Sequence, residues 1–330
     1  MGLVGVGLLA RVLDRAKHWT DLGERGSDWG PALMGFIYRT LGRTACLGAL
    51  APVILFFYIT GASQRRASLD YLRRVWAASG RRGKPGHIHA LLHFFAFGES
   101  LIDKFAAWLG NIDRSQIDAM DGAQVEAFRR DPRGAVIFSA HFGATEVIRA
   151  LAAHHMRRRI NVLIHTKNAR HFNDLIKKFA PQSRVALVEA GNFDVATAVN
   201  LSAAVERGEW VVIMGDRMPV TKTARSVTVN FLGAPAQFPQ GPYLLAAALR
   251  CPTYMLFCSK EEGRHRIHFS HLSDAVTLPR RNRMAGLQAI VQNFACVLEE
   301  RVKAAPYQWF NFYDFWAAPV EGSQGEDVRG

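Results

Sequence analysis

The sequence predicts an α/β fold with a central, mostly parallel sheet flanked by helices. Beyond residue 134, short apolar runs alternate with longer segments of helical periodicity. Strands separated by helices of about ten to fifteen residues are typical of parallel sheets, because parallel neighbours need a crossover connection. With 330 residues and 49% apolar content, the chain is long and apolar enough to bury a large core.

The predicted elements follow one another along the chain. Residues 64–130 show helical periodicity, and residues 282–305 form the last predicted helix. Apolar runs between them predict strands at 135–140, 160–165, 184–190, 210–216, 226–233 and 252–261. Helices are expected between these strands at 145–158, 169–180, 194–208 and 241–250. We therefore predict one α/β domain from residue 64 to residue 330.

An uncharged segment precedes this domain. Thr44–Ser63 contains twenty residues without a charged side chain, and about 20 apolar residues are needed to cross a bilayer. Arg43 lies before it, and Arg65 and Arg66 open a basic cluster after it. Such clusters are attracted to anionic membrane surfaces. Residues 1–63 are expected to anchor the chain to a membrane, either spanning the bilayer or dipping into it. A buried core helix is the alternative.

The charge balance indicates which kinds of partner the protein binds, and the positions of its cysteines and histidines show whether a metal site is expected. Lys and Arg exceed Asp and Glu by 41 to 28, which leaves a net charge of +13 and favours an anionic partner. Nucleic acid is not expected, because the arginines match no recognisable binding module. The four cysteines have no zinc spacing, and His89 and His93 lack a third ligand nearby, so no metal site is predicted.

Candidate acid–base residues follow the first predicted strand of the domain. His141 comes directly after strand 135–140, and Glu146 lies five residues later at the start of the next predicted helix. Ligands of open α/β sheets bind beyond the carboxyl ends of strands. A turn at Phe142-Gly143 would let Glu146 fold back towards His141, as an orienting carboxylate behind a general base. Such spacing also arises by chance, so the surrounding residues decide.

Five motifs, in order, resemble one family. "SAHFGATE" resembles the His-x4-Asp/Glu motif of the lysophospholipid-type acyltransferase superfamily, in the form found in bacterial late acyltransferases of lipid A biosynthesis. "GDRMP", "FLGAPAQFPQGPYLLAAAL", "CPTYMLF" and "PYQWF" are similar to later segments of the same family. The resemblance covers nearly the whole chain. It implies a glycerolipid acyltransferase-like fold and an enzyme at the cytoplasmic face of the bacterial inner membrane.

The resemblance also implies a reaction and its residues. A fatty acyl group on acyl carrier protein or coenzyme A would pass directly to a hydroxyl or amine of a lipid acceptor. His141 would act as general base and Glu146 would orient it, without a cofactor. Arg217 is a candidate oxyanion or phosphate contact, with a structural ion pair as its alternative. The expected substrate-binding residues are Phe142, Gly143, Asp216, Arg217, Pro239 and Gly241.

The acceptor and two alternative functions stay open. Family members that acylate lipid A carry basic residues after the C-terminal aromatic cluster, whereas this chain has Tyr313 and Asp314 there. Asp314 is unfavourable beside a phosphate, so the acceptor need not be a phosphorylated lipid A precursor. The alternatives are a non-catalytic lipid-binding protein with the same fold, and a hydrolase of acyl thioesters that uses water as its acceptor.

Overall fold

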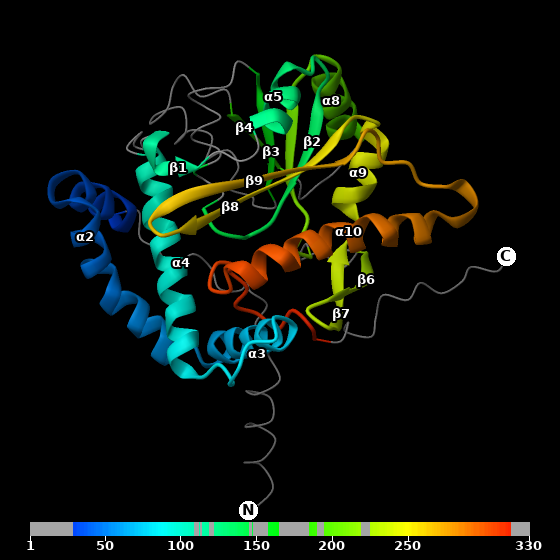
Figure 1. Cartoon of the computed structure of the whole chain (residues 1–330). Coiled ribbons are helices and arrows are strands. Elements are labelled where there is room, and N and C mark those ends of the chain that lie inside the picture. Colours follow the sequence, from blue (N-terminus) through cyan, green and yellow to red (C-terminus); the bar gives the residue numbers. More distant parts are fainter. Residues whose placement is uncertain are drawn as a thin grey trace, which may run out of the picture.

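The computed structural model describes residues 29–108, 112, 114–118, 122–144, 147, 158–164, 185–189, 195–218 and 225–317. Within them lies a seven-stranded sheet with the order β1-β9-β8-β2-β5-β3-β4 (Figure 1). The strands are β1 (Ile117–Asp118), β2 (Ala135–Ser139), β3 (Ile160–Ile164), β4 (Val185–Glu189), β5 (Trp210–Met214), β8 (Thr253–Glu261) and β9 (Arg264–Ser273). All neighbours pair in parallel except β8 and β9. The predicted mostly parallel sheet is confirmed.

Three described strands, β1, β7 and β9, were not predicted. β7 (Ala234–Pro239) pairs with the predicted β6 (Ser226–Phe231) in a separate antiparallel hairpin, and β1 lies within residues 64–130, which were expected to be helical. The other predicted strands agree with the structure to within about two residues. The described helices that flank the sheet are α5 (Gly122–Arg130), α8 (Val195–Glu206), α9 (Gly241–Leu249) and α10 (Arg283–Ala304). The predicted helices 145–158 and 169–180 lie almost entirely outside the described residues.

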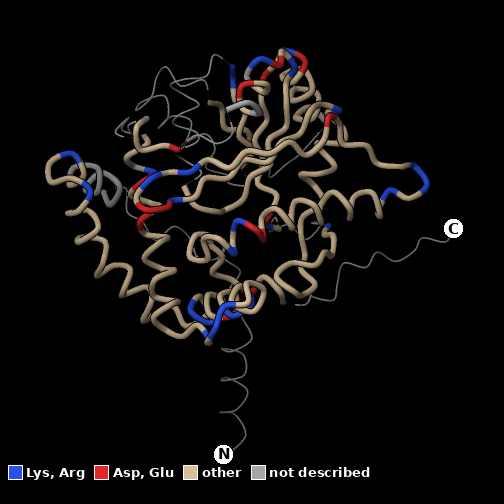
Figure 2. The backbone as a smooth tube through the Cα atoms, viewed as in Figure 1, with Lys and Arg blue, Asp and Glu red and all other residues tan. Residues whose placement is uncertain are grey.

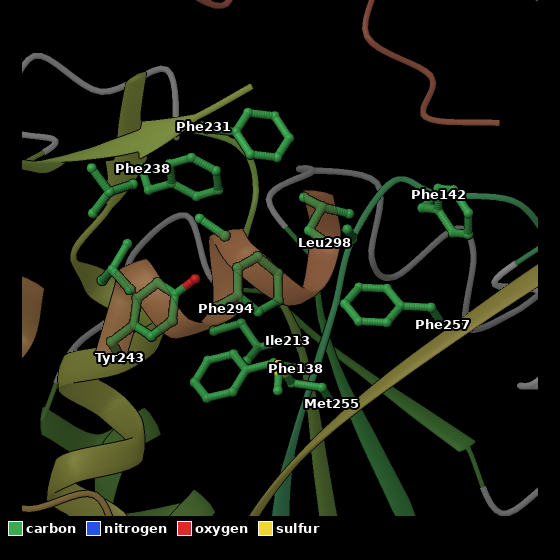
Figure 3. Packing of buried hydrophobic residues seen from close by; sticks show 14 of the residues in the cluster. Phe138, Phe142, Ile213, Phe231, Phe238, Tyr243, Met255, Phe257, Phe294 and Leu298 are labelled. Carbon is green, nitrogen blue, oxygen red and sulfur yellow. The ribbon is translucent and has the colours of Figure 1, made fainter. Parts of the chain in front are cut away.

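The main core lies between the sheet and helices α9 and α10. Leu287, Val291, Phe294, Leu298 and Val302 recur every three or four residues along α10 and are buried. Figure 3 shows how Phe294 lies against Phe138 of β2 and Tyr243 of α9. Phe138 and Tyr243 stack with 4.8 Å between ring centroids. Each fully buried aromatic contributes on the order of 1.5–3 kcal/mol, so this cluster fixes the position of β2.

Three helices form the N-terminal part of the described chain. They are α2 (Trp29–Thr60), which is kinked at Gly42, α3 (Ala62–Ala78) and α4 (His87–Trp108). Short 3₁₀ turns lie at Arg114–Gln116 and Arg280–Asn282. Only 11% of the apolar 18-residue window within Ile37–Thr60 is buried. The alternative of a buried core helix for the uncharged segment is therefore wrong. Ile37–Thr60 is, by length and composition, apolar enough to cross a membrane.

Candidate active site

The site forms where two neighbouring parallel strands end. Ser139 of β2 pairs with Met214 of β5, and His141 and Asp216 each lie two residues beyond their strand. The register therefore places the two side chains next to each other. The Nδ1 atom of His141 lies 2.9 Å from Oδ1 of Asp216, and the backbone N–H of His141 donates to Oδ2 at 2.9 Å. The carboxylate thus holds both the ring and the peptide of His141.

Trp309 completes the hydrogen bonding of Asp216. Its indole Nε1–H donates to Oδ2 at 3.0 Å, and both residues are almost fully buried. Asp216 therefore has donors on both of its oxygens and no exposed surface. The His141 side chain, in contrast, is 34% exposed. An imidazole in this position presents its outer nitrogen to an incoming molecule.

The charges of the pair follow from its surroundings. Burial opposes ionisation of Asp216, but the ring and backbone N–H of His141 and the Arg217 guanidinium outweigh it and hold the pKa of Asp216 at about 2. Burial of the ring, together with Arg217, lowers the pKa of His141 below its ordinary 6.5. At pH 7 the carboxylate is ionised and the imidazole is neutral. Since Asp216 only accepts hydrogen bonds, the ring proton sits on Nδ1 and the lone pair sits on Nε2.

A glycine turn directs the chain away from the strand end. Gly143 has φ of +61°, which confirms the expected turn at Phe142-Gly143. Its N–H donates to the carbonyl of Gln308 at 2.7 Å, and the N–H of Ala144 donates to the carbonyl of Cys258 at 2.9 Å. A Cβ at position 143 would lie 1.8 Å from that Cys258 oxygen, so only glycine fits there. β8 and the C-terminal segment therefore hold the loop from both sides.

The C-terminal aromatic segment is part of the site rather than a surface feature. The N–H of Phe310 donates to the carbonyl of His141 at 2.9 Å. Trp309 and Phe142 form an isolated antiparallel β-bridge through their backbones. Trp309 and Phe310 are buried, as is Phe315. These three aromatics therefore belong to the packed interior. The contact of Trp309 with Asp216 was missed, and its only signal was the motif "PYQWF".

A buried histidine supports the same segment from the helical side. His93 of α4 has no exposed surface, and burial lowers its pKa to about 4 although the hydrogen bond to the backbone of Trp309 acts in the opposite direction. Its Nε2 lies 2.9 Å from the carbonyl of Trp309, and its Nδ1 lies 2.9 Å from Oγ of Ser68. A carbonyl only accepts, so Nε2 carries the proton and Nδ1 accepts from the serine. His93 thus joins α3 and α4 to Trp309.

The remaining predicted site residues lie around the His141–Asp216 pair. The Arg217 guanidinium donates to the carbonyl of Phe310 at 2.5 Å. Phe142 is 1% exposed and packs against Phe257. Pro239 ends β7, and Gly241 begins α9. That helix reaches the site through Tyr243, whose hydroxyl donates to the carbonyl of Gly215 at 3.2 Å.

Glu146 cannot be compared with these residues. It lies outside the described residues, as does Thr145, and its role stays a prediction. Among the residues that the structure does describe, no group of three or more His, Cys, Asp and Glu side chains is arranged to hold a metal ion. The side chains at the strand ends are therefore a histidine–aspartate pair with a tryptophan donor.

Two comparisons with known proteins bear on the identity of the chain. A search of curated protein sequences gives no match, whereas a family profile does. The family profile described as "Bacterial lipid A biosynthesis acyltransferase" matches residues 97–317, which is more than half of the chain and includes both strand ends and the Trp309 segment. The fold, the ordered motifs and this match lead to one conclusion: the chain belongs to the bacterial lipid A biosynthesis acyltransferase family and is an acyltransferase.

Proposed function

We propose that the protein transfers a fatty acyl group from acyl carrier protein or coenzyme A to a hydroxyl or amine of a lipid acceptor. The reaction takes place at the cytoplasmic face of the bacterial inner membrane. The observation that supports this most is the 2.9 Å contact between His141 and Asp216, which leaves Nε2 unprotonated on a side chain that is 34% exposed. The family match supports the acyl transfer, and the acidity of acyl carrier proteins suits a chain of net charge +13.

The proposed chemistry is direct transfer. Nε2 of His141 removes the proton of the acceptor as its oxygen or nitrogen attacks the thioester carbonyl. The tetrahedral intermediate then collapses, the carbon–sulfur bond breaks, and the imidazolium returns the proton to the leaving thiolate. Asp216 stabilises the imidazolium while the proton resides there. General base catalysis of this kind contributes roughly 10²–10⁴ in rate.

The nucleophilic residues near the site support transfer without a covalent intermediate. Burial raises the pKa of the Cys258 thiol to about 12, so it is protonated at neutral pH and a poor nucleophile. The hydroxyl of Ser139 is almost fully buried and donates to the carbonyl of Leu256 at 2.8 Å. Neither side chain is placed to accept an acyl group from a donor.

We assign Asp216 to holding His141 rather than to contacting substrate. Both of its oxygens have protein donors, and its surface is fully covered. Phe142, Gly143, Pro239 and Gly241 stay proposed substrate contacts, and Glu146 stays a proposed orienting residue. Arg217 lies close enough to lower the pKa of His141, so a developing negative charge on the substrate would be stabilised beside it.

The acceptor is proposed as a lipid without a phosphate at the contact with the C-terminal aromatic segment. Asp314 is exposed there, between Tyr313 and the buried Phe315. A carboxylate at that position repels a phosphate and favours an amine or a neutral hydroxyl. The masses of the lipid products test this assignment.

The test is mass spectrometry of lipids from host cells with the wild-type protein, with His141→Ala, and with an empty vector. We expect a lipid class to gain one acyl mass with the wild type only. The purified enzyme is then given that lipid with either acyl carrier protein or coenzyme A as donor. Free fatty acid formed equally with and without lipid would show a hydrolase. A lipid bound by both forms but unchanged in mass would show a lipid-binding protein.

The pH profile of kcat/KM provides a second prediction. The base must be neutral, and its pKa is below 6.5, so activity is expected to persist below pH 6.5 and to fall at more acidic pH. Removing the cation in Arg217→Gln makes the imidazolium easier to form. Its acid limb should therefore shift to higher pH. A wild-type midpoint above 6.5, or an unshifted limb in Arg217→Gln, would contradict His141 as the base.

A further inference from the structure

The part of helix α2 that follows the kink at Gly42 belongs to the stretch long enough to cross a membrane, but it is attached to α4 at both of its ends. At one end, just after the kink, Arg43 pairs with Asp103 at 3.1 Å. At the other, the hydroxyl of Tyr58 donates to the carbonyl of His87 at 2.9 Å, and the Tyr58 ring packs on Phe94. Arg43 and Tyr58 are fifteen positions apart, which corresponds to roughly 22 Å of helix at 1.5 Å per residue. Over this length α2 runs antiparallel to α4 (Figure 1).

The two helices also pack closely between these ends. A Cβ at Gly98 of α4 would lie 2.4 Å from the Cδ1 atom of Ile54 and 3.0 Å from Cδ2 of Leu50. Glycine at position 98 thus allows α2 to approach α4 directly. Because contacts at the middle and at both ends hold the pair together, the two helices take up one orientation towards any membrane.

The opposite side of α4 is fixed to the catalytic domain. His93 contacts Trp309, and the ring of Phe97 packs on Phe310. Nζ of Lys260, from β8, lies 2.8 Å from Asp103. α4 is therefore held between α2 and the α/β domain along most of its length. If α2 crossed the bilayer, α4 and the domain behind it would have to enter the hydrocarbon with these charges.

Such an arrangement is unfavourable. The hydrocarbon core is about 30 Å thick, so it would enclose nearly the whole paired length of α2 and α4. Ionised side chains at the bilayer centre cost at least about 2.5–3.5 kcal/mol each. The catalytic site, which Trp309 joins through its hydrogen bond to Asp216, would also be enclosed by the hydrocarbon. The contacts therefore favour an orientation in which α2 does not cross the bilayer.

The exposed apolar side chains show which surface meets the lipid instead. On α2, Val53, Leu55, Phe56, Phe57 and Ile59 are each 45% exposed or more. On α4, Ile88 and Leu92 are 74% and 47% exposed. We call these seven residues the α2–α4 face. Among the described residues outside α2 and α4, only Val199 and Met284 are large apolar side chains of similar exposure. Exposed apolar side chains concentrated on two neighbouring helices in this way mark an interaction site.

Cations border this face. Arg66, Arg73, Arg81, Arg82 and Lys84 are exposed near the end of α2 that carries Ile59, and Arg39 is exposed near the other end. Figure 2 shows the uncharged lengths of α2 and α4 between these blue segments. An apolar surface with basic ends is complementary to a bilayer that contains anionic headgroups.

We propose that α2 lies along the membrane surface beside α4, with the α2–α4 face inserted into one leaflet and both ends of α2 on the same side of the bilayer. The basic ends contact anionic headgroups. The strand ends of the catalytic domain then stay in water, within reach of a soluble donor, while the acceptor comes from the leaflet that the face enters. The proposal does not depend on which reaction His141 performs.

Cysteine labelling tests the orientation of the full-length protein. Arg39→Cys and Arg82→Cys are introduced singly into a Cys296→Ser background, since the other three cysteines are buried. Each is labelled with a membrane-impermeant maleimide in sealed inverted and right-side-out vesicles, with detergent-opened vesicles as the measure of full labelling. We expect both positions to react in vesicles of the same orientation. Reaction from opposite sides would show that α2 crosses the bilayer and would overturn the proposal.

Vesicle flotation tests the surface. Phe56→Asp and Leu92→Asp are each expected to weaken binding to phosphatidylglycerol-containing vesicles by about tenfold or more. Val199→Asp is the matched control, because Val199 of α8 is 59% exposed and Phe56 is 60% exposed. It should bind like the wild type, as should His141→Ala. Weaker binding is also expected to phosphatidylcholine vesicles than to anionic ones. If Phe56→Asp binds normally but no longer self-associates, the face joins two copies of the chain and the proposal is wrong.

Discussion

Replacing Asp216 with asparagine is expected to lower kcat by about 10²–10⁴ while changing KM little. The amide would present an N–H₂ group or a neutral oxygen to Nδ1 of His141, which now donates to a charged carboxylate at 2.9 Å. The imidazolium that forms in the transition state would lose its counter-charge. The proton would also lose its fixed place on Nδ1, which keeps Nε2 available as the base. Steady-state transfer assays with the purified variant measure the effect.

Two comparisons separate this role from general damage. Because His141 and Asp216 act as one unit, the double variant His141→Ala, Asp216→Asn should be no slower than His141→Ala alone. Glu146→Gln, made in parallel, measures the other proposed carboxylate. A loss in Glu146→Gln equal to that in Asp216→Asn would assign orientation to both. An active Asp216→Asn enzyme with an inactive Glu146→Gln would refute the role of Asp216.

The Gly143→Ala substitution is expected to have the largest effect on folding. Its Cβ would lie 1.8 Å from the carbonyl oxygen of Cys258, and alanine at a φ of +61° costs about 1–2 kcal/mol by itself. The loop would have to move and lose one or both of its backbone hydrogen bonds to Gln308 and Cys258. We expect the free energy of unfolding to fall by about 3 kcal/mol or more. Denaturant unfolding in detergent measures it.

Gly233→Ala is the matched control. Gly233 also has positive φ, +77°, but no atom lies within 4 Å of its Cβ position. Only the conformational cost of about 1–2 kcal/mol is therefore expected there. Activity of the folded fraction should be unchanged in Gly233→Ala and reduced in Gly143→Ala, because the loop at residue 143 continues from His141. Equal destabilisation of the two variants would show that the backbone at Cys258 moves away from the added Cβ at little cost, and would contradict the prediction.

The central parallel strands β2, β3, β4 and β5 were predictable because each is mostly buried and reads as an apolar run. The two-residue β1 has no such run, and it was missed within a stretch that was expected to be helical. β2 was expected at 135–140 and observed at Ala135–Ser139. β9 was not predicted, because Arg264–Ser273 carries three histidines and two arginines and has no such run. Its position depends on a tight turn in which Glu262 and Gly263 both have positive φ. Glutamate rarely takes that conformation, so the turn had little sequence signal.

The site was predictable in part. His141 followed from its place after a strand, and Asp216 was singled out as well, but as a substrate contact. Their pairing across 75 residues depends on β2 lying beside β5, with Ser139 opposite Met214. Strand order is a property of the whole fold and not of any local pattern. The same holds for Trp309, whose indole reaches Asp216 from a segment 93 residues further along the chain.

The dependence of the site on Trp309 and Phe310 has a consequence for synthesis. Both residues are translated after β2, β5, β8 and α10. A ribosome-bound chain that already exposes His141 and Asp216 still lacks the indole and the backbone N–H that hold them. α2 emerges long before, and segments near the N-terminus fold first during synthesis. Enzymatic activity therefore begins only once translation has passed residue 310, after the helix that meets the bilayer has been made.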